Sequence, residues 1–169
     1  MEICRQEQFW FAVQVRPRHE FASARMLRSK GFEEFVPVYS AKRQWSDRQK
    51  QVDFPLFVGY VFCRFHPVKK LPIINTAGVI RIVGTSQGPA AIADHEIDAI
   101  RKVVESGEQV QPHPYIAVGS KVRIEEGPMA GIEGIFIREK KGSEMVISLD
   151  LLQRSISLQI KGYMIRPVN

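Results

Sequence analysis

The chain has 169 residues, of which 44% are hydrophobic and 25% are charged, and both fractions are near the average for soluble globular proteins. These values exclude wholesale disorder, and the length allows one domain or two small ones. No apolar run approaches the roughly 20 residues that span a bilayer, and the polar N-terminus lacks the apolar stretch of a signal peptide. We therefore expect a cytoplasmic protein that does not contact a membrane.

Excess positive charge is concentrated in the N-terminal part of the chain. Residues 1–105 contain 16 Lys and Arg against 11 Asp and Glu, whereas residues 106–169 contain 8 against 7. Such an excess fits a nucleic-acid or acidic-protein partner, although proteins that bind neither often carry a similar charge. Cys4 and Cys63 form no CxxC motif, so we expect neither a disulfide framework nor a zinc site. Cys63 lies in an apolar strand and is predicted to be buried.

Residues 1–105 carry the periodicities of short strands and helices. In chain order the predicted elements are a strand (Phe9–Val15), a helix (Glu20–Lys30), a short strand (Phe35–Tyr39), an exposed hairpin or mobile loop (Ala41–Asp53), a strand (Phe57–Phe65), a short helix that Pro72 ends or kinks, a strand (Val79–Val83) and a helix N-capped by Asp94. The face of the first helix that we expect to be buried carries Phe21, Ala24 and Leu27. This order predicts an α+β domain in which helices cover one side of an antiparallel sheet.

A polar segment with two prolines, residues 106–116, is predicted to be a linker. Residues 117–169 contain only short alternating segments separated by turn residues. The predicted strands here are Lys121–Glu125, Gly134–Glu139, Glu144–Leu149 and Ser155–Gln159. This spacing is typical of a small five-stranded β-barrel.

The segment Phe57–Phe65 has the strongest strand pattern in the chain. Strict alternation puts Tyr60 and Phe62 on one side of the strand and Phe57 on the other. If helices cover one face only, the second face exposes Tyr60 and Phe62 together with Trp10, an apolar patch typical of a binding site. Coverage of that face by loops or by barrel closure is the alternative, and the residues alone do not separate the two interpretations.

The segment Val118–Ile135 contains three glycines, Gly127, Gly131 and Gly134, at a predicted turn between two alternating strands. As a whole string, this segment is similar to the KOW motif, a strand–loop–strand unit of small SH3-like barrels. KOW barrels also occur in ribosomal proteins, so a ribosome- or RNA-binding protein is the alternative function.

The segments of the N-terminal part that decide between these functions are Trp10–Val15, Pro55–Phe62, Gly78–Gly84 and Pro89–Asp94. In this order they resemble the NGN domain of the NusG family of transcription elongation and antitermination factors. The resemblance implies an NGN domain at 1–105, a linker at 106–116 and an SH3-like KOW domain at 117–169. Its PLF-x-x-Y-x-F string is closer to the RfaH-like and UpxY-like paralogues of polysaccharide operons than to the general factor.

The same resemblance implies a monomeric factor that docks on RNA polymerase. In the family, the aromatic side of the mid-domain strand packs on the clamp helices of the polymerase's largest subunit, which closes the clamp and suppresses pausing or termination. The positions implied here for polymerase binding are Trp10, Gln14, Phe57, Tyr60 and Phe62.

Basic residues after the first strand and on the first helix match positions at which the family approaches upstream or non-template DNA. These residues are Arg16, Arg18, Arg25 and Arg28. Flexible cations can follow the phosphates of any sequence, although a solvated helix face explains them equally well. Trp45, in the basic segment 41–53, could stack on a base or be a covered indole.

For the barrel, the resemblance implies that apolar positions at the rim of the KOW loop and at a neighbouring turn bind a partner, either ribosomal protein S10 or the Rho terminator. The matching positions are Met129, Ile132 and Leu152. The four histidines are scattered, and the sequence contains no HExxH, Walker, GxGxxG or nucleophile-elbow motif. We therefore expect no enzyme activity, no cofactor and no metal ion.

Overall fold

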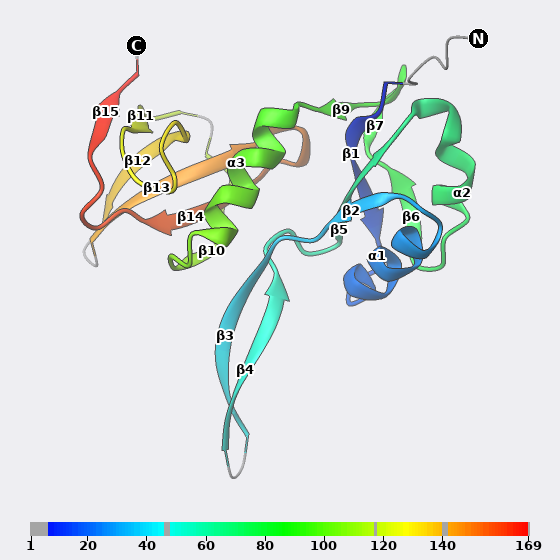
Figure 1. Cartoon of the computed structure of the whole chain (residues 1–169), viewed down its shortest axis with the longest axis horizontal. Coiled ribbons are helices and arrows are strands. Elements are labelled where there is room, and N and C mark those ends of the chain that lie inside the picture. The colour runs from blue at the N-terminus through cyan, green and yellow to red at the C-terminus, as the bar shows by residue number, and fades with distance from the viewer. Residues whose placement is uncertain (1–6, 46–47, 117, 140–141, 169) are drawn as a thin grey trace. The chain divides into compact units, whose positions relative to one another are not determined.

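The computed structural model describes residues 7–168 apart from 46–47, 117 and 140–141 (Figure 1). The chain forms two compact units, Met1–Val36 with Phe57–Ile97, and Pro37–Leu56 with Asp98–Asn169. Residues 37–56, which include the predicted hairpin, and residues 98–105 of the last helix group with the second unit.

The first unit is built on an antiparallel sheet with the strand order β2-β5-β1-β6, in which β9 also pairs with β1. Its elements are β1 (Phe9–Val15), α1 (Glu20–Ser29), β2 (Glu33–Phe35), β5 (Tyr60–Phe65), the 3-10 turn η1 (Pro67–Lys69), α2 (Lys70–Ile74), β6 (Val79–Ile82), β7 (Gly84–Thr85), β8 (Gly88–Pro89), β9 (Ala91–Ile92) and the first turn of α3 (Asp94–Glu105). The mixture of helices and antiparallel strands confirms the predicted α+β class.

One face of this sheet packs on α1 and α2. The cluster contains the inward residues of β1 and β5 with the buried sides of the two helices, namely Phe11, Val13, Val15, Ala24, Leu27, Val61, Cys63, Phe65 and Ile73. The rings of Phe11 and Phe65 lie 4.5 Å apart. The expectation for Phe21 was wrong, because its side chain is 44% exposed while Glu20 and Ser23 turn inward on α1.

Two predicted helix boundaries also differ from the structure. Pro72 does not end a helix but lies in the first turn of α2, where its missing N–H would have no partner in the helix. Its carbonyl accepts from Lys30 Nζ at 2.8 Å. Asp94 is the first residue of α3 rather than its N-cap, and Glu96 Oε2 accepts the N–H of Ala93 at 3.1 Å.

Of the two structures expected for residues 41–53, a hairpin or a mobile loop, the structure has the hairpin, which extends further than expected. Strands β3 (Val38–Trp45) and β4 (Arg48–Pro55) form a two-stranded antiparallel sheet. Within the described residues, neither strand joins another sheet.

The C-terminal barrel has six described strands where five were predicted, in the order β10-β14-β13-β12-β11-β15. Its elements are β10 (Val110–His113), β11 (Ser120–Ile124), β12 (Glu133–Glu139), β13 (Gly142–Leu149), η2 (Asp150–Leu152), β14 (Arg154–Gln159) and β15 (Ile165–Pro167). Strand β10 lies inside the predicted linker, and its Pro112 is tolerated because β10 is an edge strand. Across the described ranges of the chain, no helix is long and apolar enough to cross a bilayer.

Burial should protect Cys63 from modification. Desolvation, followed by the negative charges of Glu34 and Glu33, raises the pKa of this thiol from 9.0 to about 12, so it stays protonated and a poor nucleophile at neutral pH. In a Cys4→Ser variant, a thiol-specific disulfide reagent at mildly alkaline pH is expected to react only after denaturant is added. Rapid stoichiometric reaction of the native variant would contradict the buried position.

Candidate binding surfaces

The sheet face opposite the α1–α2 cluster is the candidate docking face, and its centre is more covered than predicted. Trp10 is 3% exposed and Phe62 is fully buried, which corrects the expectation that both aromatics are exposed. Tyr60 and Gln14, which are direct cross-strand partners, are half-buried. Only the Tyr60 end of this face therefore offers accessible side chains among the predicted residues.

Phe57 lies on the same side as Phe62, which strict alternation did not predict. The strand does not begin until Tyr60, because a turn occupies residues 56–59 and Gly59 adopts a positive φ of 84°. The Phe57 ring meets the Phe62 ring edge-on, with centroids 5.5 Å apart, and is 2% exposed. Phe35 packs near Phe62 at 6.3 Å, so Phe62 contacts an aromatic ring from each of two other segments.

Three hydrogen bonds hold this turn in place. The Gly59 carbonyl accepts from Val15 N at 2.8 Å, and the Tyr60 N–H donates to the Phe57 carbonyl at 3.1 Å. The Gly59 N–H donates to Glu20 Oε1 at 2.8 Å, and Glu20 is only 3% exposed. A buried carboxylate needs such donors, so the first residue of α1 is tied directly to the turn that precedes β5.

Arg81 joins the accessible end of the docking face, although the sequence had not singled it out. Its Nε donates to Gln14 Oε1 at 2.8 Å, and its position on β6 is directly opposite Gln14. The sequence offers no clear signal for it, since alternation within the predicted strand Val79–Val83 puts Arg81 on the same side as Val79 and Val83. Tyr60, Gln14 and Arg81 thus form one polar-aromatic rim, which we call the Tyr60 rim.

The four predicted DNA-binding arginines all lie on the surface of the first unit. Arg16 and Arg18 are in the turn after β1, where Arg18 has a left-handed φ of 67°, and Arg25 is exposed on α1. Arg28 differs because its guanidinium forms an ion pair with Glu34, and its Nε donates to Glu34 Oε1 at 2.8 Å. Within the described part of the chain, Arg16, Arg18 and Arg25 form no ion pair.

The predicted partner-binding residues of the barrel lie in its interior. Met129 is fully buried, Ile132 is 3% exposed and Leu152 is 7% exposed, so none of them forms an accessible rim. The Gly131 N–H donates to the Ile124 carbonyl at 2.8 Å, which closes the loop that carries Met129 and Ile132 against β11. Leu152 lies outside this loop, at the end of η2. Periodicity could not show which way a glycine-rich loop folds over its own barrel.

The barrel loop is nevertheless the glycine turn that the sequence predicts. Gly127 and Gly131 have φ values of 86° and 85°. At Gly134, a Cβ would lie 2.6 Å from the Val146 carbonyl oxygen, so this position excludes a side chain. Met164, whose carbonyl accepts the N–H of Glu125 at 2.9 Å, is an accessible apolar residue, at 60% exposure. Among the described residues, no group of three or more His, Cys, Asp or Glu side chains is arranged to hold a metal ion.

Comparison with known proteins gives one consistent result. Residues 8–101 match the family described as "Transcription termination factor nusG". The Transcription termination/antitermination protein NusG of Vibrio vulnificus (strain CMCP6) is 27% identical over 170 aligned residues, which cover 90% of this chain and 91% of that protein. The protein of the same name from Pseudomonas aeruginosa is 29% identical over 143 residues, covering 75% and 78%.

A solved structure described as "Domain interaction in Thermotoga maritima NusG" has the same fold. It aligns with a TM-score of 0.57 at 15% identity, covering 96% of this chain and 98% of that one. This similarity supports the combination of an α+β unit with a β-rich unit in one chain.

Removing the Glu20 carboxylate should loosen the turn before β5. Glu20→Ala leaves the Gly59 N–H without its buried acceptor, which is expected to lower the free energy of unfolding by about 1–3 kcal/mol. Glu20→Gln keeps an acceptor oxygen and is expected to cost less. Urea denaturation of both variants checks this order, and an Ala variant as stable as the parent would show that the bond contributes nothing.

Proposed function

The chain belongs to the NusG family of transcription factors, and from this premise we propose that it binds RNA polymerase through its first unit. The proposed target is the pair of clamp helices of the polymerase's largest subunit. The observation that carries the proposal is the Tyr60 rim, because it combines a half-buried aromatic ring with polar side chains at an accessible end of the sheet face.

The five predicted polymerase-binding residues take two different roles in this proposal. Tyr60 and Gln14 contact the polymerase, and Arg81 adds a charge beside them. The rings of Trp10, Phe57 and Phe62 are buried, and their role in the proposal is to fix the position of Tyr60. Full burial of one aromatic side chain contributes about 1.5–3 kcal/mol, and Tyr can also hydrogen-bond at an interface.

The proposed effect on transcription is restraint of a conformational equilibrium. A ligand shifts such an equilibrium only by its difference in affinity for the two states. If the unit binds the closed clamp more tightly than the open clamp, each 1.4 kcal/mol of difference favours closure about tenfold. Pausing or termination that requires clamp opening would then become rarer, with no chemical step performed by the chain.

DNA contact by the first unit is a second part of the proposal. Arg16, Arg18 and Arg25 are exposed cations without ion-pair partners among the described residues, so their charge is available to upstream or non-template phosphates. Arg28 contributes less because Glu34 already neutralises it.

The barrel is proposed to recruit a protein partner, ribosomal protein S10 or Rho. Because Met129, Ile132 and Leu152 support the barrel from inside, contact would fall on neighbouring accessible residues such as Met164. The proposal of a specialised antitermination role rests on the PLF-x-x-Y-x-F string alone.

Tyr60→Ala tests the docking proposal. It is expected to weaken binding to purified RNA polymerase at least tenfold while leaving the urea unfolding transition nearly unchanged, because Tyr60 is half-buried. Phe21→Ala is the matched control, since Phe21 is an exposed aromatic on α1 of the same unit. Equal loss in both variants, or retention of the chain on ribosomal RNA but not on polymerase, would overturn the proposal.

The salt dependence of DNA binding tests the arginines. Each phosphate contact adds about 0.7–0.9 to the slope of log affinity against log salt, so Arg16→Gln with Arg18→Gln should lower the slope on forked DNA by about 1.5. Arg28→Gln, whose guanidinium is already paired, should change it less. An unchanged slope in the double variant would assign these arginines to a solvated surface.

A further inference from the structure

The β3–β4 hairpin has two chemically different faces. Residues directly opposite each other in an antiparallel pair project to the same side. One side, which we call the Trp45 face, carries four cross-strand pairs in order from base to tip, Tyr39–Phe54, Ala41–Val52, Arg43–Lys50 and Trp45–Arg48. The other side carries mainly uncharged polar residues, with Lys42 as its described cation.

Among the described residues of the hairpin, no acid neutralises the positive charge on the Trp45 face. Arg43 lies directly opposite Lys50, and like charges in this position are destabilising. Arg43, Lys50 and Arg48 form no ion pair within the described residues, and the described residues of this face include no acid. Asp53 is on the opposite face, where its carboxylate accepts from Ser40. Among the described residues of the hairpin, this face therefore has cations without a neighbouring acid.

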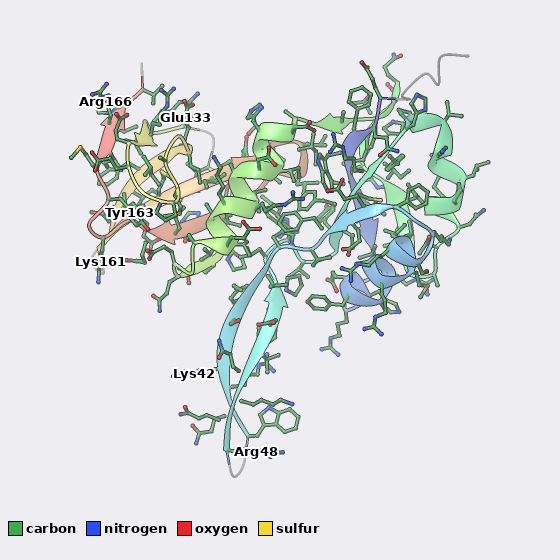
Figure 2. All side chains as sticks on the ribbon, viewed as in Figure 1. Lys42, Arg48, Glu133, Lys161, Tyr163 and Arg166 are labelled. Atoms are coloured by element: carbon green, nitrogen blue, oxygen red, sulfur yellow. The ribbon has the colours of Figure 1, made fainter. Side chains whose placement is uncertain are left out.

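Trp45 is exposed at the end of this face. Its side chain is 64% exposed, the highest exposure among the aromatic residues described as exposed. The sequence left open whether this indole is covered, and the structure shows that it is exposed. Figure 2 shows Arg48, its cross-strand partner, near the free end of the hairpin. An exposed indole beside cations is the combination that binds unpaired nucleotides, because bases stack on the ring while the cations follow the phosphates.

The base of the face stabilises this arrangement. The Arg43 guanidinium lies over the Phe54 ring at 5.0 Å from its centroid, and Tyr39 packs against Phe54 at 5.7 Å. The cation–π contact orients Arg43 along the face without neutralising its charge. The hairpin thus presents an apolar base, a band of charge and a terminal indole on one side.

We propose that the Trp45 face binds a single strand of DNA, with Trp45 stacking on a base and Arg43, Arg48 and Lys50 contacting phosphates. The inference rests on the proposed function for the source of the strand, which is the unpaired DNA of a transcribing complex. It adds a site distinct from the arginines of the first unit. Duplex DNA does not offer free base faces to the indole, so it should bind more weakly.

The test uses the full chain without polymerase and a labelled oligothymidylate, with affinity measured by fluorescence anisotropy. Trp45→Leu is expected to weaken binding about tenfold, because base–aromatic stacking is lost, whereas Trp45→Phe should retain most of the affinity. In the parent chain, the oligonucleotide should also quench tryptophan emission, since Trp10 is buried and Trp45 is exposed.

A matched pair of charge variants tests whether one face of the hairpin accounts for oligonucleotide binding. Lys50→Gln and Lys42→Gln remove the same charge from opposite faces of the hairpin. Lys50→Gln should weaken binding several-fold and Lys42→Gln much less. Equal losses from the two variants, an unchanged affinity of Trp45→Leu, or tighter binding of duplex DNA or of oligouridylate would each overturn the proposal.

The two proposals can fail separately. Because the oligonucleotide assay contains no polymerase, its failure would leave docking through the Tyr60 rim untouched. Conversely, Tyr60→Ala should bind the oligonucleotide like the parent chain even though it loses polymerase. If Arg16→Gln with Arg18→Gln abolished oligonucleotide binding while the hairpin variants retained it, the site would belong to the first unit, and the inference would be wrong.

Discussion

The buried Glu20 carboxylate holds the turn before β5, and the organisation of the candidate docking face depends on this contact. By accepting the Gly59 N–H, it fixes where the strand begins, while the Val15 N–H holds the Gly59 carbonyl from β1. Because the turn interrupts strand alternation, Phe57 reaches Phe62 on the same side. The buried rings then leave Tyr60 at the accessible end. Without this turn, the aromatic string would be divided between two faces.

Local periodicity predicts much of the fold. Strand β1 has the predicted bounds, and α1 is one residue shorter than predicted. The hairpin is one of the two structures that the charged, weakly periodic segment 41–53 allows. Contacts between distant segments set the remainder. Strand β10 exists because it pairs with β14, more than forty residues later, and nothing in its own proline-containing sequence indicates a strand. The inward fold of Met129 is likewise decided by the barrel around it.

In the candidate sites, too, some properties could be predicted from local sequence and others depend on contacts between distant segments. The residue types at the docking face and the charge of the hairpin were readable from the sequence, whereas exposure was not. Trp10 is buried although the sequence predicts that it is exposed, because it lies in a sheet, and Trp45, for which the sequence leaves both possibilities open, is exposed near a hairpin end. In the proposed account, a closed sheet supports one protein-binding rim and a charged hairpin supplies a nucleic-acid contact.

Site-specific crosslinking tests the central claim of polymerase docking most directly. A benzophenone amino acid placed at position 60 has a size close to that of Tyr60 and reacts only with groups in contact with it. Irradiation of this protein with purified RNA polymerase should give an adduct on the clamp helices of the largest subunit, and the same amino acid at position 21 should not. An adduct at neither position, equal adducts at both, or an adduct from position 60 elsewhere on the polymerase would contradict the account.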